Sequence, residues 1–193
     1  MRTMHAAAVT ALLALLSPVG NASLAHAQGL PNPYRIAEGW AQLPNGKPMG
    51  AVGKAVTDPD GRHIWAVVRC ERLEDPARFG DECRDSKTDP IVKFGPDGKV
   101  VKTFGGGLFI WPHGLDVDKE GNVWVTNAVS PSRIPKGDKR GHIVVKFSPE
   151  GSVLLTLGMG GMEGSGPDHF TSPSDVVVSP AGDVFIADGH GEN

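Results

Sequence analysis

After residue 27 the sequence lacks any stretch of 11 or more residues in which apolar side chains recur at helical spacing, so helices are not expected to build this fold. It also lacks a cluster of lysines and arginines, and its net charge is only −3, which makes nucleic acid an unexpected partner. Neither a Gly-x-Ser-x-Gly nor a His-Glu-x-x-His motif occurs, so nothing supports a serine hydrolase or a zincin. Turn formers are abundant instead, with 26 glycines and 16 prolines beside 39% apolar residues. This mixture favours many short strands joined by tight turns.

Cysteine is scarce: Cys70 and Cys83 are the two in the sequence, and both lie in the polar segment 70–90. Their spacing of 13 residues matches no metal-binding motif. In an oxidising compartment a disulfide closing this loop is the favoured interpretation, and two free thiols are the alternative. The bond would add roughly 2–3 kcal/mol of stability and carry no chemistry.

The N-terminus has the pattern of an export signal. Arg2 precedes an apolar run of 11 residues at 6–16, and a small-residue pattern, Ala-His-Ala, follows at 25–27. The run is too short to cross a bilayer, which takes about 20 residues. We therefore expect residues 1–27 to be a signal peptide cleaved after Ala27, and the mature protein to be secreted or periplasmic with no membrane contact.

The rest of the chain is built from repeated hairpins. In residues 111–127 apolar residues alternate on both sides of an Asp-x-x-Gly turn, the pattern returns in 173–188, and a weaker copy lies in 53–65. A second hairpin also repeats, with Lys-Phe-Gly-Pro-Asp-Gly at 93–98 and Lys-Phe-Ser-Pro-Glu-Gly at 146–151. One unit is therefore two hairpins, or four strands in about 40 residues plus insertions, which is typical of a β-propeller blade. A solenoid is the alternative architecture.

These repeats predict an all-β fold of four-stranded blades that is an incomplete propeller. About two and a half blades are expected after a surface lead-in at 28–49, which Trp40 anchors. The first blade covers about 50–105, the second about 111–158, and half of a third about 172–193. Propellers close with roughly four to eight blades. We therefore expect this sequence to be the N-terminal part of a longer protein whose remaining blades are its partners, and to be unstable alone unless copies of it assemble.

Three motifs resemble a known family. They are Pro-His-Gly-Leu at 112–115 within its hairpin, Asp-His-Phe-x-x-Pro-Ser-Asp-Val at 168–176, and Ala-Asp-Gly at 187–189. Over about residues 50–193 the sequence resembles six-bladed NHL-type propellers, and among them the peptidyl-α-hydroxyglycine α-amidating lyases. The resemblance implies cleavage of a peptidyl-α-hydroxyglycine to a peptide amide and glyoxylate. It also implies a zinc ion held by three histidines from different blades, and a calcium ion bound partly through backbone carbonyls.

Carried over by position, the resemblance makes His113 the first zinc ligand. Gly53 and Ser174 occupy the equivalent place in the other two repeats and cannot supply an imidazole. The other two histidines are expected in blades beyond this sequence, so we expect no activity from it alone. Leu115 and its counterpart Ala55 match calcium positions that act through main-chain oxygens. Ordinary core packing is the alternative for both.

Two further residues correspond to catalytic positions. Arg69 falls where the family keeps a catalytic arginine, and its guanidinium could grip a substrate carboxylate; the alternative is a surface arginine paired with Glu71. His190 stands where the family has a tyrosine proposed to take part in proton abstraction. Histidine can move a proton near neutral pH, although it could equally coordinate metal or have no role.

Four other polar residues are expected to be structural or exposed. Asp188 should form a turn, and His169 should be hydrogen-bonded in the loop before the last hairpin. His63 and His142 are expected to face solvent.

The main functional hypothesis is an exported zinc-dependent lyase with a structural calcium and a peptide or small-molecule carbinolamide substrate. One alternative is a non-enzymatic NHL propeller that binds peptide or protein. Another is a calcium-dependent lactonase-like hydrolase, for which the acidic ligands are not evident. Further Pro-His motifs at blade starts would favour the lyase.

Overall fold

The computed structural model describes residues 32–70 and 76–190, and these contain strands and short 3-10 turns but no α-helix. The predicted leader, the start of the lead-in and Glu71 lie outside the described residues. Residues from Ala37 onward form one compact unit, and the described residues before it are exposed. Among the described residues, no helix is long and apolar enough to cross a membrane.

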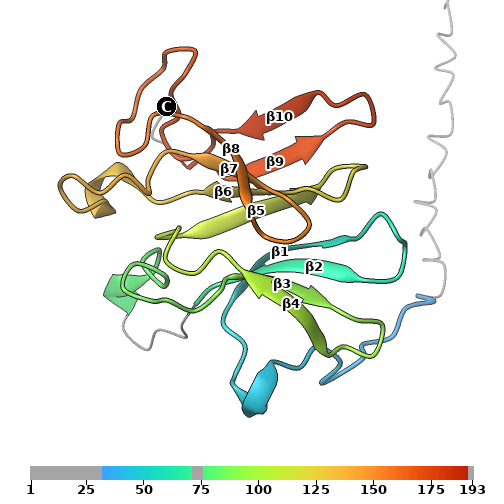
Figure 1. Cartoon of the computed structure of the whole chain (residues 1–193). Coiled ribbons are helices and arrows are strands. Elements are labelled where there is room, and N and C mark those ends of the chain that lie inside the picture. Colours follow the sequence, from blue (N-terminus) through green and yellow to red (C-terminus); the bar gives the residue numbers. More distant parts are fainter. Residues whose placement is uncertain (1–31, 71–75, 191–193) are drawn as a thin grey trace, which may run out of the picture. The chain divides into compact units, whose positions relative to one another are not determined.

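The strands form two complete antiparallel sheets and one hairpin (Figure 1). The first sheet has the order β1 (Val52–Thr57), β2 (Ile64–Val68), β3 (Ile91–Phe94), β4 (Val100–Phe104). The second has the order β5 (Pro112–Val117), β6 (Val123–Asn127), β7 (Val144–Phe147), β8 (Val153–Leu157), and the hairpin pairs β9 (Asp175–Val178) with β10 (Val184–Ala187). Short 3-10 turns lie at Pro44–Gly46, Pro76–Arg78 and Pro131–Arg133. The predicted all-β fold of four-stranded, propeller-type blades is confirmed.

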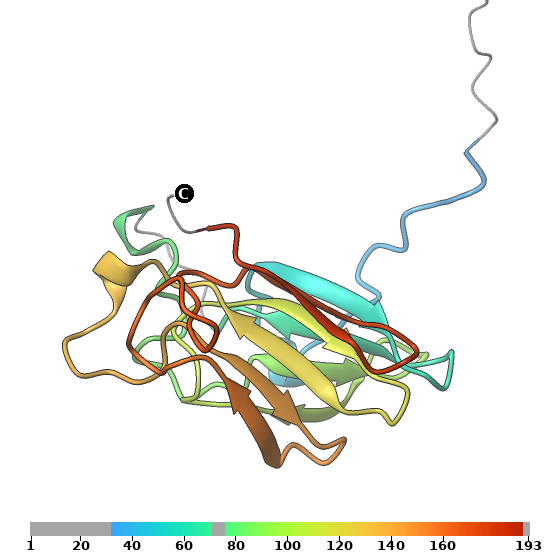
Figure 2. The ribbon, with the colours of Figure 1, turned by 90° about the horizontal axis from the view of Figure 1, so that it is seen from above.

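The first strands of the three units lie side by side, β1 beside β5 and β5 beside β9 (Figures 1 and 2). Two glycines allow this approach. A Cβ added to Gly53 would lie 2.5 Å from the main-chain oxygen of His113, and one added to Gly114 would lie 2.6 Å from the Cα of Asp175. Any larger residue at these positions would push the inner strands apart.

The main core lies between the two complete sheets. Its fully buried side chains come from alternate positions of the facing strands, and Phe104 and Phe147 meet across it with ring centroids 5.2 Å apart. The opposite face of the first sheet is covered by the lead-in, where Trp40 lies 6.0 Å from Phe94 and donates from Nε1 to the oxygen of Pro96. The predicted anchoring role of Trp40 is thus confirmed.

Each complete blade is braced by the same three side chains, an aspartate, a tryptophan and a lysine: Asp58, Trp65 and Lys93 in the first, and Asp118, Trp124 and Lys146 in the second. In the second, Trp124 Nε1 lies 3.2 Å and Lys146 Nζ 3.1 Å from the same carboxylate oxygen of Asp118. The lysine also lies over the indole ring, 4.9 Å from its centroid. In the last hairpin, Ser179 and Phe185 occupy the aspartate and tryptophan positions.

Three expectations about individual residues can be compared with the fold. The disulfide between Cys70 and Cys83 is present, as predicted. The expectation that His142 faces solvent is wrong, because the loop leading to β9 covers it and only 2% of it is exposed. Its ring nitrogen Nδ1 lies 2.5 Å from the main-chain oxygen of Thr171. The backbone of His142 has a left-handed conformation, with a φ of 60°. His63 is half-buried and pairs with Asp60 at 2.5 Å.

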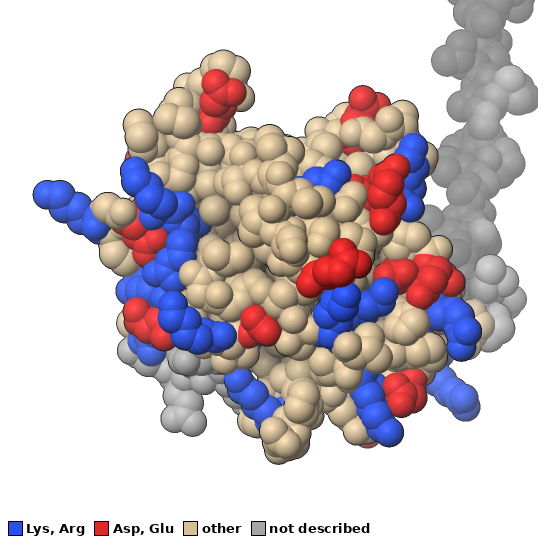
Figure 3. All heavy atoms as spheres, in the orientation of Figure 1, with Lys and Arg blue, Asp and Glu red and all other residues tan. Residues whose placement is uncertain are grey.

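Charged side chains of both signs are interspersed on the face shown in Figure 3. Several apolar side chains remain exposed in β8, β9 and β10, namely Val153, Leu154, Leu155, Val177 and Phe185.

Candidate active site

Four side chains from three blades gather at one edge of the sheets: Arg69, Trp111, His113 and His190. The ring centroids of His113 and His190 are 4.9 Å apart, and each lies close to Trp111, at 5.1 and 5.5 Å. The guanidinium carbon of Arg69 lies 4.7 Å from the centre of the Trp111 ring. The structure therefore brings together three residues that the sequence singled out, around a tryptophan that it did not.

The strand topology explains this gathering. Within an antiparallel hairpin, the start of the first strand and the end of the second lie at the same edge. His113 is at the start of β5, whereas Arg69 follows β2 and His190 follows β10. Because β1, β5 and β9 are neighbours, these strand ends meet.

His113 is held in one tautomer by the neighbouring blade. Its Nδ1 lies 2.8 Å from the main-chain oxygen of Ser174, and a carbonyl oxygen can only accept, so Nδ1 carries the proton. Burial lowers the pKa of His113, the bond to Ser174 raises it, and nearby His190 and Arg69 lower it, with a net decrease. The ring is therefore neutral near pH 7 and its Nε2 keeps a lone pair.

A neutral imidazole whose other nitrogen bonds a carbonyl is the form in which histidine binds zinc. The donor chemistry of His113 thus fits the ligand role. Within residues 32–70 and 76–190, no three histidine, cysteine or carboxylate side chains converge on a possible metal position. A tetrahedral zinc site would need further ligands beside this one.

Arg69 is buried, with 8% of its surface exposed, and it pairs with Glu82. One of its terminal nitrogens, Nη1, lies 3.2 Å from Glu82 Oε1, and its guanidinium carbon lies 5.1 Å from the ring centre of Phe79. It is therefore not the surface arginine of the alternative interpretation. The sequence could have indicated this pair, because each charged residue directly precedes a cysteine of the disulfide, as Arg69-Cys70 and Glu82-Cys83.

The two predicted calcium positions differ in their surroundings. Leu115 is fully buried in the main core, whereas Ala55 is exposed. They lie on the adjacent strands β5 and β1, opposite Val125 and Ala66 respectively. Calcium binding through their main-chain oxygens stays a prediction.

A cavity of about 170 Å³ opens beside His113 and His190, and an ion pair that the sequence analysis missed lines it. Lys54 Nζ lies 2.7 and 2.8 Å from the two carboxylate oxygens of Asp175. His190 also borders a second cavity of about 480 Å³, whose other lining residues include Glu163 and Thr171. An exposed imidazole between two cavities can exchange protons with a ligand in either one.

Asp188 has a structural role, but it acts on the segment before β9 and not in the local turn that was predicted. Its two carboxylate oxygens accept from the main-chain nitrogens of Thr171 and Ser172, at 2.7 and 2.6 Å. At the equivalent place in the second blade, Asn127 accepts from the main-chain nitrogen of Trp111 at 2.7 Å. These bonds fix the chain where it enters β5 and β9. His169 meets its expectation only in the main chain, where its nitrogen donates to Gly166 at 3.0 Å; its buried ring nitrogen Nδ1 has no hydrogen-bond partner within the described part of the chain.

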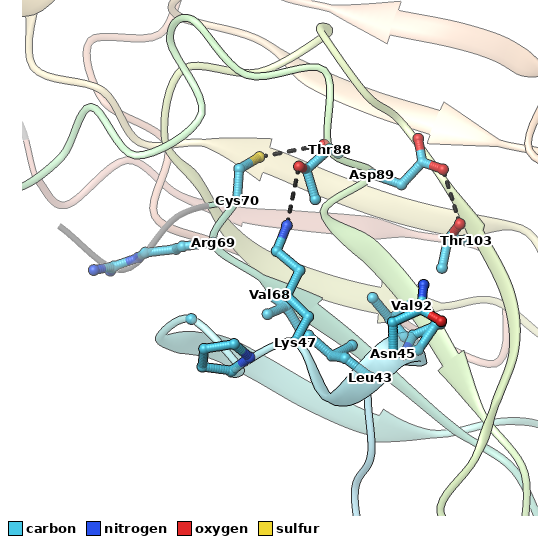
Figure 4. Close-up of a pocket in the computed structure, with 13 residues that line it drawn as sticks. Leu43, Asn45, Lys47, Val68, Arg69, Cys70, Thr88, Asp89, Val92 and Thr103 are labelled. Carbon is cyan, nitrogen blue, oxygen red and sulfur yellow. Dashed lines mark hydrogen bonds between the residues drawn. The ribbon is translucent and has the colours of Figure 1, made fainter.

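A further pocket, of about 260 Å³, lies between the lead-in and the first sheet (Figure 4). Its walls are mostly apolar, and Lys47 donates across it to Thr88 Oγ1 at 3.2 Å. Arg69 borders this pocket, but its side chain extends away from it in Figure 4. The guanidinium therefore belongs to the cluster around Trp111.

Comparison of the sequence with known proteins finds relatives that are named as amidating lyases. The chain is 32% identical over 152 residues to a probable peptidyl-alpha-hydroxyglycine alpha-amidating lyase of Caenorhabditis elegans, covering 75% of this chain and 40% of the relative. It is 41% identical over 174 residues to peptidyl-alpha-hydroxyglycine alpha-amidating lyase 1 of Drosophila melanogaster, covering 83% of this chain and 29% of the relative. No family model matches.

Among solved structures, a gluconolactonase from Xanthomonas campestris aligns with a TM-score of 0.43 and 16% identity, covering 76% of this chain and 40% of that one. The chain spans about two-fifths or less of the length of the relatives named above. Over that span the chain belongs to the family of the peptidyl-alpha-hydroxyglycine alpha-amidating lyases.

Proposed function

We propose that this chain is part of an exported, zinc-dependent lyase that cleaves peptidyl-α-hydroxyglycine to a peptide amide and glyoxylate. The observation that carries the proposal is the state of His113: its Nδ1 donates to Ser174, which leaves Nε2 free beside His190 and Arg69. The relatives named as amidating lyases support the reaction class.

Each residue of the cluster would have a distinct task. His113 would hold zinc through Nε2, and zinc, when bound, supplies Lewis-acid chemistry at the substrate hydroxyl. Arg69 would bind the carboxylate of the hydroxyglycine, because a guanidinium matches a carboxylate with parallel donors. Leu115 and Ala55 would contribute main-chain oxygens to a structural calcium on adjacent strands.

His190 would act as the general base. It would take the proton from the substrate hydroxyl as the carbon–oxygen double bond forms and the carbon–nitrogen bond breaks. The electron pair of the broken bond passes to the amide nitrogen, which receives a proton, so the products are the amide and glyoxylate. Proton transfer by a histidine suits a reaction near neutral pH.

The experiment uses the complete purified protein, with metal analysis and a glyoxylate-release assay on a peptidyl-α-hydroxyglycine. We expect about one zinc ion per chain and its loss in His113→Ala. Retained zinc and activity in that variant would discard the site assignment. Peptide binding without any glyoxylate release would instead favour the non-enzymatic propeller.

A further inference from the structure

The disulfide and the buried ion pair are adjacent in both sequence and space. Arg69 directly precedes Cys70, and Glu82 directly precedes Cys83. The bond between the cysteines therefore brings together the arginine just before the polar segment 70–90 and the glutamate within that segment. Reduction would leave the pairing to depend on non-covalent contacts alone.

Both charged side chains are almost fully buried: 8% of Arg69 and 6% of Glu82 is exposed. Glu82 uses one oxygen for Arg69 and the other to accept from the main-chain nitrogen of Gly80 at 3.0 Å. The loop is also tied to the segment just before β5, which carries Trp111, because Cys83 donates from its main-chain nitrogen to the main-chain oxygen of Ile110 at 3.0 Å. Glu82 is thus fixed beside the Arg69 guanidinium before any ligand arrives.

The pairing leaves Arg69 with donors to spare. A guanidinium has five N–H donors, and the bond to Glu82 uses one of them. Arg69 Nε is buried and has no hydrogen-bond partner among the described residues. A buried charged donor without a partner is costly, and an anionic ligand with paired oxygens would satisfy it.

We infer that Glu82 is a positioning residue: with the adjacent disulfide it holds the Arg69 guanidinium against Trp111, so that Arg69 meets a ligand carboxylate already oriented. This inference rests on the proposed function for the identity of that ligand, the carboxylate of the α-hydroxyglycine. The gain is preorganisation, because the side-chain entropy of Arg69 is lost on folding and not on binding.

The test compares Glu82→Gln with Asp85→Asn in the complete protein. Both substitutions remove one negative charge from the same loop at nearly constant shape, but Asp85 is 78% exposed and lies 3.9 Å from Arg78. In the glyoxylate-release assay, Glu82→Gln should raise KM about tenfold with a smaller change in kcat, as expected for losing a charge-assisted hydrogen bond. Asp85→Asn should leave KM unchanged, and reducing the disulfide of the unaltered protein should raise KM in the same direction.

A purely structural Glu82 would lower the melting temperature and leave KM of the folded protein unchanged, which would overturn the inference. A second measurement separates this outcome from failure of the proposed function. Glyoxylate is titrated into each protein while tryptophan fluorescence is recorded, with no turnover needed. Glu82→Gln should bind it about tenfold more weakly than the parent, consistent with one charged hydrogen bond. Equal affinity, or no binding to the parent, would overturn the inference even if the lyase reaction is absent.

Discussion

The ammonium group of Lys54 on β1 donates to both carboxylate oxygens of Asp175 on β9, which lies 121 residues further along the sequence. The strand β5 lies between the two, and Gly114 lets it pass close to the backbone of Asp175. The residue before Asp175 is Ser174, whose carbonyl orients His113. This ion pair therefore holds the third unit in the register that fixes the imidazole.

Replacing Lys54 with methionine should weaken this link while keeping the side-chain length. The two side chains are 27% and 43% exposed, so solvent screening limits the loss to about 1 kcal/mol or less. Urea unfolding at low and high salt measures it. Lys119→Met is the control, since Lys119 is 66% exposed and lies 3.8 Å from Glu120. A Lys54 effect no larger than that of the control would contradict the proposed link.

The inner glycines should not tolerate a side chain. Gly114→Ala places its Cβ 2.6 Å from the Cα of Asp175, and backbone cannot easily give way, so we expect a loss of roughly 1–3 kcal/mol. Gly189→Ala is the matched control, because its nearest contact would be an ordinary 3.4 Å. Thermal unfolding of both variants distinguishes them, and similar melting temperatures would refute the close approach of β5 and β9.

Acid should unfold the blades partly through their braces. Burial of Asp118 raises its pKa, but hydrogen bonds from Asn122, Trp124 and Lys146 outweigh this and hold the pKa below its ordinary value of 3.8. A depressed carboxyl pKa stabilises the fold fully above 3.8, and this contribution is lost as pH falls through the lower, folded-state value. Stability should therefore fall steeply below about pH 4.

Asp118→Asn should reduce that acid slope and also destabilise the protein near pH 7, by about 1–3 kcal/mol, because the half-buried Lys146, 24% exposed, loses its charged partner. Urea unfolding between pH 2 and 7 records both effects. Asp97→Asn, at a 61% exposed side chain, serves as the control. An unchanged slope in Asp118→Asn would show that this carboxylate does not contribute.

Removing the disulfide by the double change Cys70→Ala and Cys83→Ala should lower the unfolding free energy by roughly 2–3 kcal/mol for a loop of this length. The expected readout is a lower urea midpoint than that of the oxidised parent. Adding reductant should shift the parent and leave the double variant unchanged. If reductant left the urea midpoint of the parent protein unchanged, the disulfide would not stabilise the fold.

The blades could be predicted because their signals are local: alternation along each strand and a turn glycine such as Gly121 are both contained in a few residues. Arg69, His113 and His190 were singled out through the resemblance to the family, and the strand topology explains why they meet. Trp111 and Glu82 were missed, because their contacts depend on how separate segments pack and not on spacing within one segment. Lys54 and Asp175 were missed for the same reason.

The burial of His142 could not be predicted either. An imidazole in a polar stretch suggests exposure, and the loop that covers it comes from later in the chain. Its left-handed backbone is uncommon for residues other than glycine and has no sequence signature here.

The braces of aspartate, tryptophan and lysine lie at the turn end of the first hairpin in each complete blade, while His113 and Arg69 lie at the opposite end. The residues that stabilise the blade and the residues that would bind a ligand thus lie at different ends of the same strands. A lineage or an engineer can exchange the residues at the recognition end, to change what is bound there, without dismantling the supports that keep each blade folded.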